Sequence, residues 1–368
     1  WRNFFDPYAR EWQNGCSRWD IINMVRLAYA LRPDGIEWPQ REDGTPSFKL
    51  EHLASANHLA QERAHDALSD VHATIGLAKL IRDKQPKLFD YVVKNRDKHS
   101  ARKLLDMDTR KPALHVSSKF PAANGCLSPV MPIAAHPSNK NCVIVYDLRV
   151  DPAPLLELPP DEIFERIFTP TADLPDDMPR VALKGVHLNK CPVLAPFEMM
   201  REEEAARLNL DINQCRRNWK AIHDQLAEVE AKATAVFDAH SFEPDGDAEA
   251  ALYDGFVSND DRKLADQVRR TSAADLADGA IVFKDNRLNE LLFRYRARHF
   301  PDTLVDAERD DWNNWLSKRL EFAPDGGLTL DDYDDVVAQL MERVQGEPEK
   351  LQLLLDLKAW SGKLRRLV

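Results

Sequence analysis

The sequence predicts a chain of three parts: helices at the N-terminal end, short strands in the middle, and helices alone at the C-terminal end. Apolar residues recur at helical spacing between residues 20 and 82. Between about 113 and 194, short β-branched runs are separated by Pro, Gly and Asn. Four periodic helical runs then fill residues 286–367. We place the domain boundaries at 1–85, 86–240 and 241–368, and 368 residues suffice for two or three domains.

Three helices are expected in the first part. Ser17, with Asp20 three residues later, is expected to cap a helix that ends before Pro33. Ser47 is expected to cap a short helix that runs to Ala56. A third helix is expected over 66–82, ending before Gln85 and Pro86. The residues expected to face the core are Ile21, Val25, Ala28 and Leu31 on the first helix, and Leu68, Val71, Ile75 and Ala78 on the third.

The middle part alternates strands with loops, and the last part contains only helices. Strands are expected at 114–116, 130–133, 142–146, 186–188 and 193–194, with a helix over 160–168 between them. A long helix over 212–237 leads to an acidic linker at 240–250. Further helices are expected at 286–299, 303–321, 329–344 and 347–367.

The net charge of −11 is unevenly distributed along the chain. Residues 1–120 contain 20 Lys and Arg against 16 Asp and Glu, so the negative charge lies in the remainder. The N-terminal third therefore has the charge that a polyanion requires, although a solvated helix face would have the same composition. The sequence has no apolar run of 18 residues, so no membrane partner is expected. Five scattered cysteines without a Cys-x-x-Cys pair favour a reducing, cytoplasmic location.

The most informative motif is Ala64-His65-Asp66-Ala67-Leu68-Ser69-Asp70, directly before and within the third helix. It resembles the last motif of the DEDDh 3′→5′ exonucleases. Asp70 would lie on a rigid first helical turn, where a metal ligand is held still. His65 would lie on the preceding loop and remove a proton from an attacking water. A surface His beside a helix start, with an Asp favoured by the helix dipole, gives the same pattern.

Two segments combine aromatic and cationic residues, as single-strand binding requires. The first segment is the N-terminal 50 residues, where Tyr8 and Trp12 would share a helical face, although such a pair more often packs in a core. The second is 293–299, where Arg alternates with aromatic residues. It suits either a groove wall or ion pairs with the acidic C-terminal part, and we favour the ion pairs.

Many separated segments resemble bacterial exonuclease I, in the same order over nearly the whole chain. The resemblance is carried by Asn3-Phe4-Phe5-Asp6-Pro7-Tyr8-Ala9, Ser17-Arg18-Trp19-Asp20, the stretches 29–36, 46–53, 85–91 and 154–158, His187-Leu188-Asn189-Lys190-Cys191-Pro192-Val193-Leu194, and Tyr295-Arg296-Ala297-Arg298-His299-Phe300-Pro301. The resemblance implies a fold class of α/β plus β-barrel plus all-α. Its parts are a partial RNase H-like exonuclease domain, a small SH3-type barrel and a C-terminal helical domain.

The resemblance also implies an activity and a site. It implies hydrolysis of single-stranded DNA from its 3′ end to 5′-mononucleotides, with two Mg²⁺ ions (or Mn²⁺), His65 as general base and Asp70 as metal ligand. The positions that match the family's DNA path are Tyr8, Trp12, Arg26, Arg32, Phe48, Lys49, His52, Lys98, Asn141, Lys184 and Leu188. The implied partner besides DNA is the acidic tail of single-strand DNA-binding protein, with exposed arginines such as Arg32 as contacts. A monomer is expected.

The sequence departs from the family at two places. The family's Asp-x-Glu strand and second Asp helix have no counterpart here, and the chain begins with Trp1, so we expect a chain that lacks an N-terminal portion. One carboxylate would hold Mg²⁺ weakly, and little activity is therefore expected. The family also has Trp where this chain has Pro129 and Ala135. The alternative function is a non-catalytic module that binds single-stranded DNA or docks a protein. An oligoribonuclease-type enzyme ranks lower because such enzymes lack the barrel and helical extension.

Overall fold

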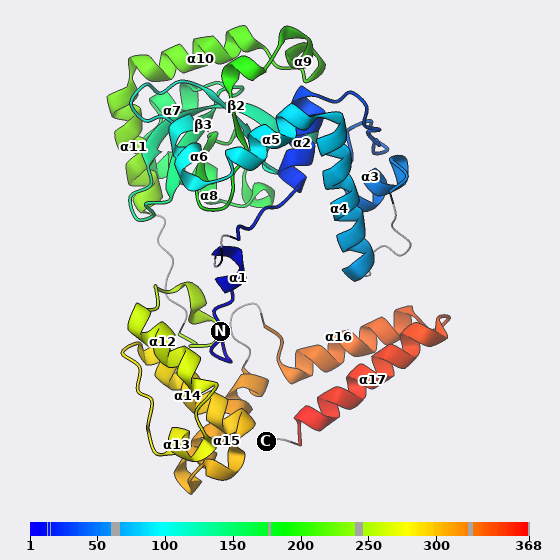
Figure 1. Ribbon diagram of the computed structural model, residues 1–368, viewed down its shortest axis with the longest axis vertical. Helices are drawn as coiled ribbons and strands as arrows, with labels where there is room; N and C mark the ends of the chain where they lie inside the picture. The colour runs from blue at the N-terminus through cyan, green and yellow to red at the C-terminus, as the bar shows by residue number, and fades with distance from the viewer. Residues whose placement is uncertain are drawn as a thin grey trace. The chain divides into compact units, whose positions relative to one another are not determined.

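The computed structural model describes residues 1–12, 14, 16–59, 67–175, 178–239, 246–322 and 327–366. It divides the chain into two compact units. One unit comprises residues 11–242, and the other combines residues 1–10 with residues 243–368. The short helix α1 (Ala9–Trp12) spans the boundary between them (Figure 1). Each unit is described separately below.

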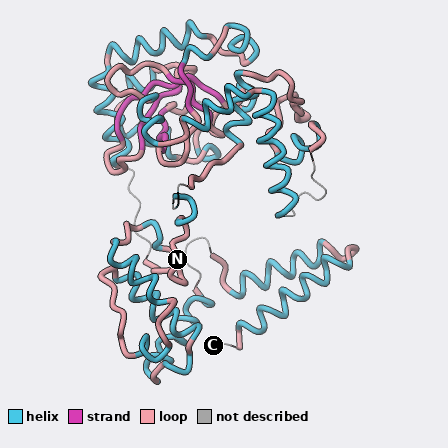
Figure 2. Tube along the Cα trace, viewed as in Figure 1, coloured by secondary structure: helices cyan, strands magenta, loops and turns pink. Residues whose placement is uncertain are grey.

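A five-stranded antiparallel sheet forms the centre of the 11–242 unit (Figure 2). Its strand order is β4-β3-β2-β1-β5. The strands are β1 (Ala113–Val116), β2 (Leu127–Ala135), β3 (Cys142–Asp147), β4 (Leu183–His187) and β5 (Leu194–Pro196). The register places Leu114 opposite Pro129 and Ala195, with a bulge between Pro132 and Ala134. All five predicted strand segments therefore fall in or beside this sheet.

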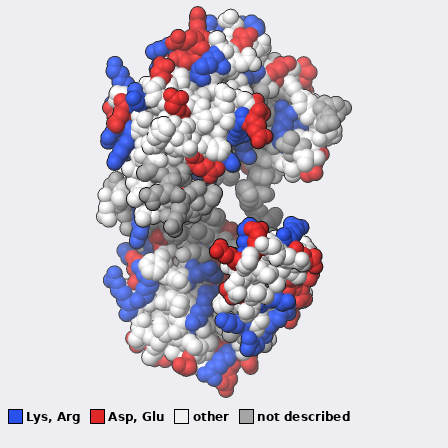
Figure 3. All heavy atoms as spheres, turned by 90° about the vertical axis from the view of Figure 1, so that its right-hand side faces the viewer, with Lys and Arg blue, Asp and Glu red and all other residues white. Residues whose placement is uncertain are grey.

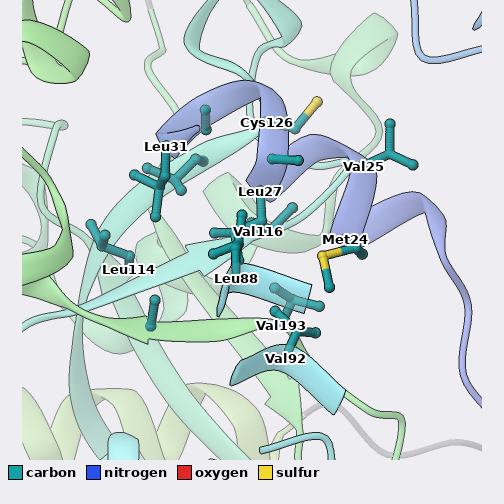
Figure 4. Close-up of a cluster of buried hydrophobic side chains, with 14 of the residues drawn as sticks. Met24, Val25, Leu27, Leu31, Leu88, Val92, Leu114, Val116, Cys126 and Val193 are labelled. Atoms are coloured by element: carbon teal, nitrogen blue, oxygen red, sulfur yellow. The ribbon is translucent and has the colours of Figure 1, made fainter. Parts of the chain in front are cut away.

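Helix α2 (Ile22–Leu31) packs one face against this sheet. Its Leu27 and Leu31 are fully buried with Leu114 and Val116 of β1, and with Leu88 and Val92 of α5 (Pro86–Lys94) (Figure 4). The helix ends before Pro33, as predicted, because the residue before a proline disfavours helical geometry. The predicted cap was wrong. The Ile22 amide donates to the Asp20 carboxylate at 2.9 Å, whereas the Ser17 hydroxyl accepts from Arg96.

A second core lies further along the same face of the sheet, where Met131 of β2 and Tyr146 of β3 pack under α8 (Pro160–Phe168) and α11 (Leu226–Asp238). The helix over 160–168 has the predicted bounds. The long helix predicted over 212–237 is instead two helices, α10 (Ile212–Asp224) and α11, which meet at Gln225. The remaining helices of this unit are α3 (Leu50–Ala56), α4 (Ala67–Lys84), α6 (Lys98–Leu104), α7 (Ala153–Glu157) and α9 (Glu202–Arg207).

The buried face of α4 differs from the predicted one. Ala73, Leu77 and Ile81 face the core, whereas Leu68, Val71 and Ile75 are 64%, 52% and 47% exposed. Both stripes have helical spacing, so periodicity alone could not choose between them. Leu68, Val71 and Ile75 therefore form an exposed apolar stripe on α4.

The other unit contains helices and no strand among its described residues (Figure 2). Its helices are α12 (Asn259–Val268), α13 (Ala273–Ala277), α14 (Asn286–His299), α15 (Asp306–Glu321), α16 (Leu330–Arg343) and α17 (Pro348–Leu364). The arginines of α14 are paired, as favoured from the sequence. Arg294 lies 2.6 Å from Asp247, and Arg296 lies 2.8 Å from Glu308. Both arginines are almost fully buried, so this segment is part of a core.

Candidate nucleic-acid interface

Two adjoining hollows open on the 11–242 unit, between α2 and the sheet. Their volumes are about 670 and 270 Å³, and Ile22, Arg26 and Ser118 line both. We call the two hollows together the α2 groove. Acidic and basic side chains interleave over the face shown in Figure 3, so that face is not uniformly acidic although the net charge of the chain is negative.

The larger hollow is cationic and has aromatic walls. Arg26, Arg41, Lys49 and Lys119 line it, and none of its described lining residues is acidic. Phe48 and Phe120 supply its rings. Phe48 is only 5% exposed and packs edge-on against Tyr29 at 5.5 Å, so most of its ring belongs to the core. Lys49, by contrast, is exposed and lies 3.7 Å from Glu51.

Arg26 lines both hollows and has a buried donor without a partner among the described residues. Its Nη1 donates to Asn23 at 2.9 Å, and its guanidinium lies 5.8 Å from the Phe48 ring centre. Its Nε is buried and donates to no partner within the described residues. A buried donor without an acceptor costs the folded chain about 1–3 kcal/mol.

The smaller hollow lies at the end of the sheet. His115, Ser117, His187 and Lys190 line it, and Asp20 is the acidic residue of its described lining. His115 is fully buried, which lowers its pKa to about 3 and keeps it neutral. Burial and the nearby Lys190 also lower the pKa of His187. The imidazoles of His115 and His187 therefore offer the smaller hollow neutral hydrogen-bonding groups, and Arg26 and Lys190 supply its positive charge.

Lys184 contacts residues that line each of the two hollows. Its Nζ donates to the Ser117 hydroxyl at 2.7 Å and lies 4.7 Å from the Phe120 ring centre. Burial lowers the pKa of Lys184 to about 8. Of the predicted residues, Arg26 of α2 and Phe48 and Lys49 before α3 line the groove, and Lys184 of β4 contacts Ser117 and Phe120 of its lining.

Other predicted DNA contacts lie elsewhere in this unit. Lys98 is exposed at the first residue of α6, and His52 is exposed with its Nδ1 2.8 Å from the Ser47 hydroxyl. The Asn141 carbonyl accepts the Leu188 amide at 2.7 Å. The Leu188 side chain is buried, so only its backbone could reach a ligand.

Tyr8 and Trp12 fall in different units. The α1 helix begins at Ala9, so Tyr8 precedes it, and the Tyr8 hydroxyl contacts that of Tyr253 within the same unit. The side chain of Trp12 lies outside the described part of the structure. Their predicted role in binding DNA stays a prediction.

Arg32 was expected to be exposed, and that expectation was wrong. Its guanidinium lies 2.8 Å from Glu204, and the two side chains are 25% and 6% exposed. The pair forms because α9 places Glu204 at the end of α2, and a buried carboxylate requires a cation.

The structure describes one of the two predicted catalytic residues. His65 lies outside the described residues, and Asp70 is half-buried on the first turn of α4. Within the described ranges, no group of three or more His, Cys, Asp or Glu side chains could hold a metal ion. The described residues therefore do not form a two-metal centre. None of the described helices is long and apolar enough to span a membrane.

Comparisons with known proteins match this architecture. The family model "Exonuclease I SH3-like domain" matches residues 96–239, and "Exonuclease I C-terminal domain" matches residues 246–364. Exodeoxyribonuclease I of Escherichia coli (strain K12) is 44% identical over 365 residues, which cover 99% of this chain and 75% of that protein.

Solved structures agree. The zinc-bound complex of E. coli exonuclease I with single-stranded DNA has a TM-score of 0.89 at 42% identity, covering 99% of this chain and 76% of that one. A structure described as SSB/exonuclease I with the inhibitor CFAM has a TM-score of 0.83 at 41% identity, covering 99% and 75%.

These matches place the chain in the exonuclease class of hydrolases. Within that class, it belongs to the exonuclease I family. The predicted fold class is confirmed, including the SH3-like middle part and the helical C-terminal part.

Sequence reasoning missed several groove residues. Arg41, Lys119, Phe120 and Lys190 line the hollows but were not singled out. Lys119-Phe120 is a cation beside an aromatic residue directly after a predicted strand, and this signal could have marked them.

Proposed function

We propose that this chain binds single-stranded DNA in the α2 groove and acts as a 3′→5′ exonuclease that releases 5′-mononucleotides. The observation that carries the binding proposal is the α2 groove itself. It combines the cations Arg26 and Lys49, of which Lys49 is exposed, with the rings of Phe48 and Phe120. Such grooves hold the phosphate backbone with cations and the bases with aromatic edges.

Family membership supports the substrate. The E. coli relative was solved with single-stranded DNA, and that complex superimposes on 99% of this chain. The cations of the larger hollow would bind the phosphates of such a strand, and phosphate contacts supply most of the sequence-independent affinity.

For the chemistry, we propose His65 as the base that removes a proton from the attacking water, and Asp70 as a metal ligand. Mg²⁺, with Mn²⁺ as its substitute, is the proposed ion because carboxylate and phosphate oxygens are its preferred ligands. The relative's structure holds zinc, which supports metal dependence without selecting the metal.

The alternative is a non-catalytic module that binds single-stranded DNA or docks a protein. It is favoured by the missing metal cluster among the described side chains. We propose, for either function, a cytoplasmic monomer with the domain boundaries at 85 and 240.

The second proposed partner is the acidic tail of single-strand DNA-binding protein. The solved assembly described as SSB/exonuclease I supports it. Because Glu204 already neutralises Arg32, a tail carboxylate would have to compete for that guanidinium. Glu204→Gln should therefore strengthen binding of an acidic tail peptide, whereas unchanged binding would exclude Arg32 as the contact.

The proposal is tested with a 5′-labelled oligo-dT strand, the same strand with a 3′-terminal phosphorothioate block, and a blunt duplex. We expect binding of both single strands, and only slow stepwise shortening of the unblocked one in Mg²⁺, because a single carboxylate would hold that ion weakly. Substitution His65→Ala should lower the rate far more than the affinity. Binding without products would support the non-catalytic module and contradict the exonuclease proposal. A preference for the duplex would contradict both.

A further inference from the structure

The first eight residues of the chain pack on helices of the C-terminal part, although the whole 11–242 unit separates the two in sequence. We call residues 1–8 the strap, and residues 243–368 the helical part. From the strap, the chain passes through α1 into the 11–242 unit, and it returns to the helical part after residue 242. The N-terminal end of the chain lies beside these helices in Figure 1. The strap therefore gives the helical part a second, non-covalent connection to the rest of the chain.

Two aromatic rings of the strap lie at the core of the helical part. Phe4 is 3% exposed and stacks on Phe283, with 5.5 Å between ring centres and 3° between ring planes. Tyr295 of α14 packs edge-on against the Phe4 ring at 5.6 Å. Trp1 packs against the same core, and its Nε1 donates to the Ala248 carbonyl at 2.9 Å. Removing the Phe4 ring would therefore leave a cavity where the strap docks.

The backbone of the strap has an uncommon conformation at Phe4. Its φ angle is +59°, in a turn that the Phe4 amide closes by donating to the Trp1 carbonyl at 2.9 Å. A bulky residue with a left-handed backbone is strained, so its surroundings must fix it. Arg269, at the end of α12, supplies such a contact, because its guanidinium donates to the Phe4 carbonyl and lies 4.2 Å from the ring centre of Phe5. The strap is therefore held by a buried ring and by a cation.

The strap ends at Tyr8, one of the predicted contacts of the DNA strand. Its hydroxyl contacts that of Tyr253, and the two ring centres are 6.5 Å apart. The link from Phe4 to Tyr8 is short and stiff, because Pro7 has a fixed φ angle and the Tyr8 amide donates to the Asp6 carboxylate at 2.9 Å. The position of the Tyr8 ring therefore depends on how Phe4 is docked.

We propose that the helical part takes part in strand binding by holding the strap, and that Phe4 and Arg269 are positioning residues that keep the Tyr8 ring in place for one base of the strand. The inference rests on the proposed binding of single-stranded DNA, with Tyr8 as a contact. It adds a role for the helical part, and it assigns that role to two residues outside the predicted DNA contacts.

The expected effect follows from the cost of ordering a released segment. A docked strap presents Tyr8 in one orientation, whereas a released strap must lose conformational freedom when the strand binds. A base that stacks on an aromatic ring contributes roughly 5- to 150-fold to affinity. Phe4→Ala should therefore weaken binding by up to that factor, and the loss in Tyr8→Ala should set its limit.

The test is fluorescence anisotropy of a labelled oligo-dT strand titrated with the full chain. Phe4→Ala and Arg269→Met should each weaken binding in a chain that contains Tyr8. In the Tyr8→Ala chain, either substitution should cause no further loss, because the residue that it positions is absent. A purely structural effect of the substitutions would instead add to that of Tyr8→Ala. Hydrogen exchange of the amides in residues 1–10, measured by mass spectrometry, reports separately whether the strap is released.

Two control variants change the helical part and leave the strap in place. Arg262→Met removes an exposed arginine from α12, the helix that Arg269 follows, and should bind the strand as the wild type does. Val337→Ala removes buried volume from α16, outside the residues that hold the strap, and should reduce stability without reducing affinity.

The outcomes separate this inference from the proposed function. Faster exchange over residues 1–10 with unchanged affinity would overturn the inference, and so would unchanged affinity in Tyr8→Ala or additive losses in the combined variants. Slow exchange in Phe4→Ala combined with Arg269→Met would also overturn it, because these two residues would then not hold the strap. In each case the proposed function stands if Arg26→Met still weakens binding. A failure of the wild-type chain to bind the strand would overturn the proposed function first.

Discussion

Replacing Arg26 with methionine separates binding from stability at the centre of the α2 groove. The change removes the one cation that lines both hollows and keeps a side chain of similar length. Methionine can also fill the space beside Phe48 because its unbranched chain adapts to irregular gaps. The substitution therefore tests the charge of Arg26 more than its volume.

The expected effect on folding is small because opposing terms nearly cancel. The variant loses one hydrogen bond to Asn23, worth about 0.5–1.5 kcal/mol, and a cation–π contact worth about 0.5–1 kcal/mol. It also loses a buried Nε without a partner, which costs the folded chain about 1–3 kcal/mol. The free energy of unfolding should change by less than about 1 kcal/mol.

The expected effect on binding is large. A hydrogen bond from a charged donor to phosphate is worth about 1.5–3 kcal/mol, so affinity for oligo-dT should fall by roughly tenfold to a hundredfold. The slope of log affinity against log salt should also weaken by about 0.7, the value for one phosphate of a single strand. Anisotropy titrations at several salt concentrations, with urea unfolding beside them, measure both. Arg217→Met, on the exposed face of α10, is the matched control. A loss of several kcal/mol in stability with unchanged affinity would refute the reasoning.

Three further predictions concern folding. Asp97 caps α6 by accepting from the amides of His99 and Ser100, so Asp97→Ala should cost about 1 kcal/mol in urea unfolding and Asp97→Asn much less; equal costs would contradict the cap. Leu77→Ala should cost about 2–5 kcal/mol and Val71→Ala under about 0.5, because Leu77 is buried and Val71 is half exposed; similar losses would contradict the observed face of α4. His115 has its pKa lowered to about 3 when folded, so its contribution is present above pH 6.5 and lost at about 1.4 kcal/mol per unit as pH falls towards 3. His115→Gln should reduce this slope, and an unchanged acid profile would contradict the assignment.

Local patterns predicted the elements well where one signal dominated. The helix over 160–168 begins at a proline and has one clear apolar face, and its bounds were correct. The five strands were found because Pro, Gly and Asn separate them. The break at Gln225 was missed because neither Gly nor Pro marks it, and both halves keep helical spacing.

Tertiary contacts determine which helix face is buried and which arginine is paired, and periodicity along the sequence does not. The α4 helix has two apolar stripes, and only packing against α3 and α5 selects Leu77 over Val71. Arg32 and Arg26 look alike in sequence, yet Glu204, 172 residues away, pairs with Arg32 alone. The groove itself could not be predicted, because α2, the loop after β1 and β4 meet only in the fold.

Photo-crosslinking tests most directly whether the α2 groove holds a single strand. Oligo-dT with halogenated uracil at each position in turn would be irradiated with the full chain, and the modified peptides identified by mass spectrometry. We predict adducts within 41–50 and 115–122, which contain Phe48 and Phe120. Adducts confined to 243–368, with none on these two segments, would contradict binding of the strand in the α2 groove.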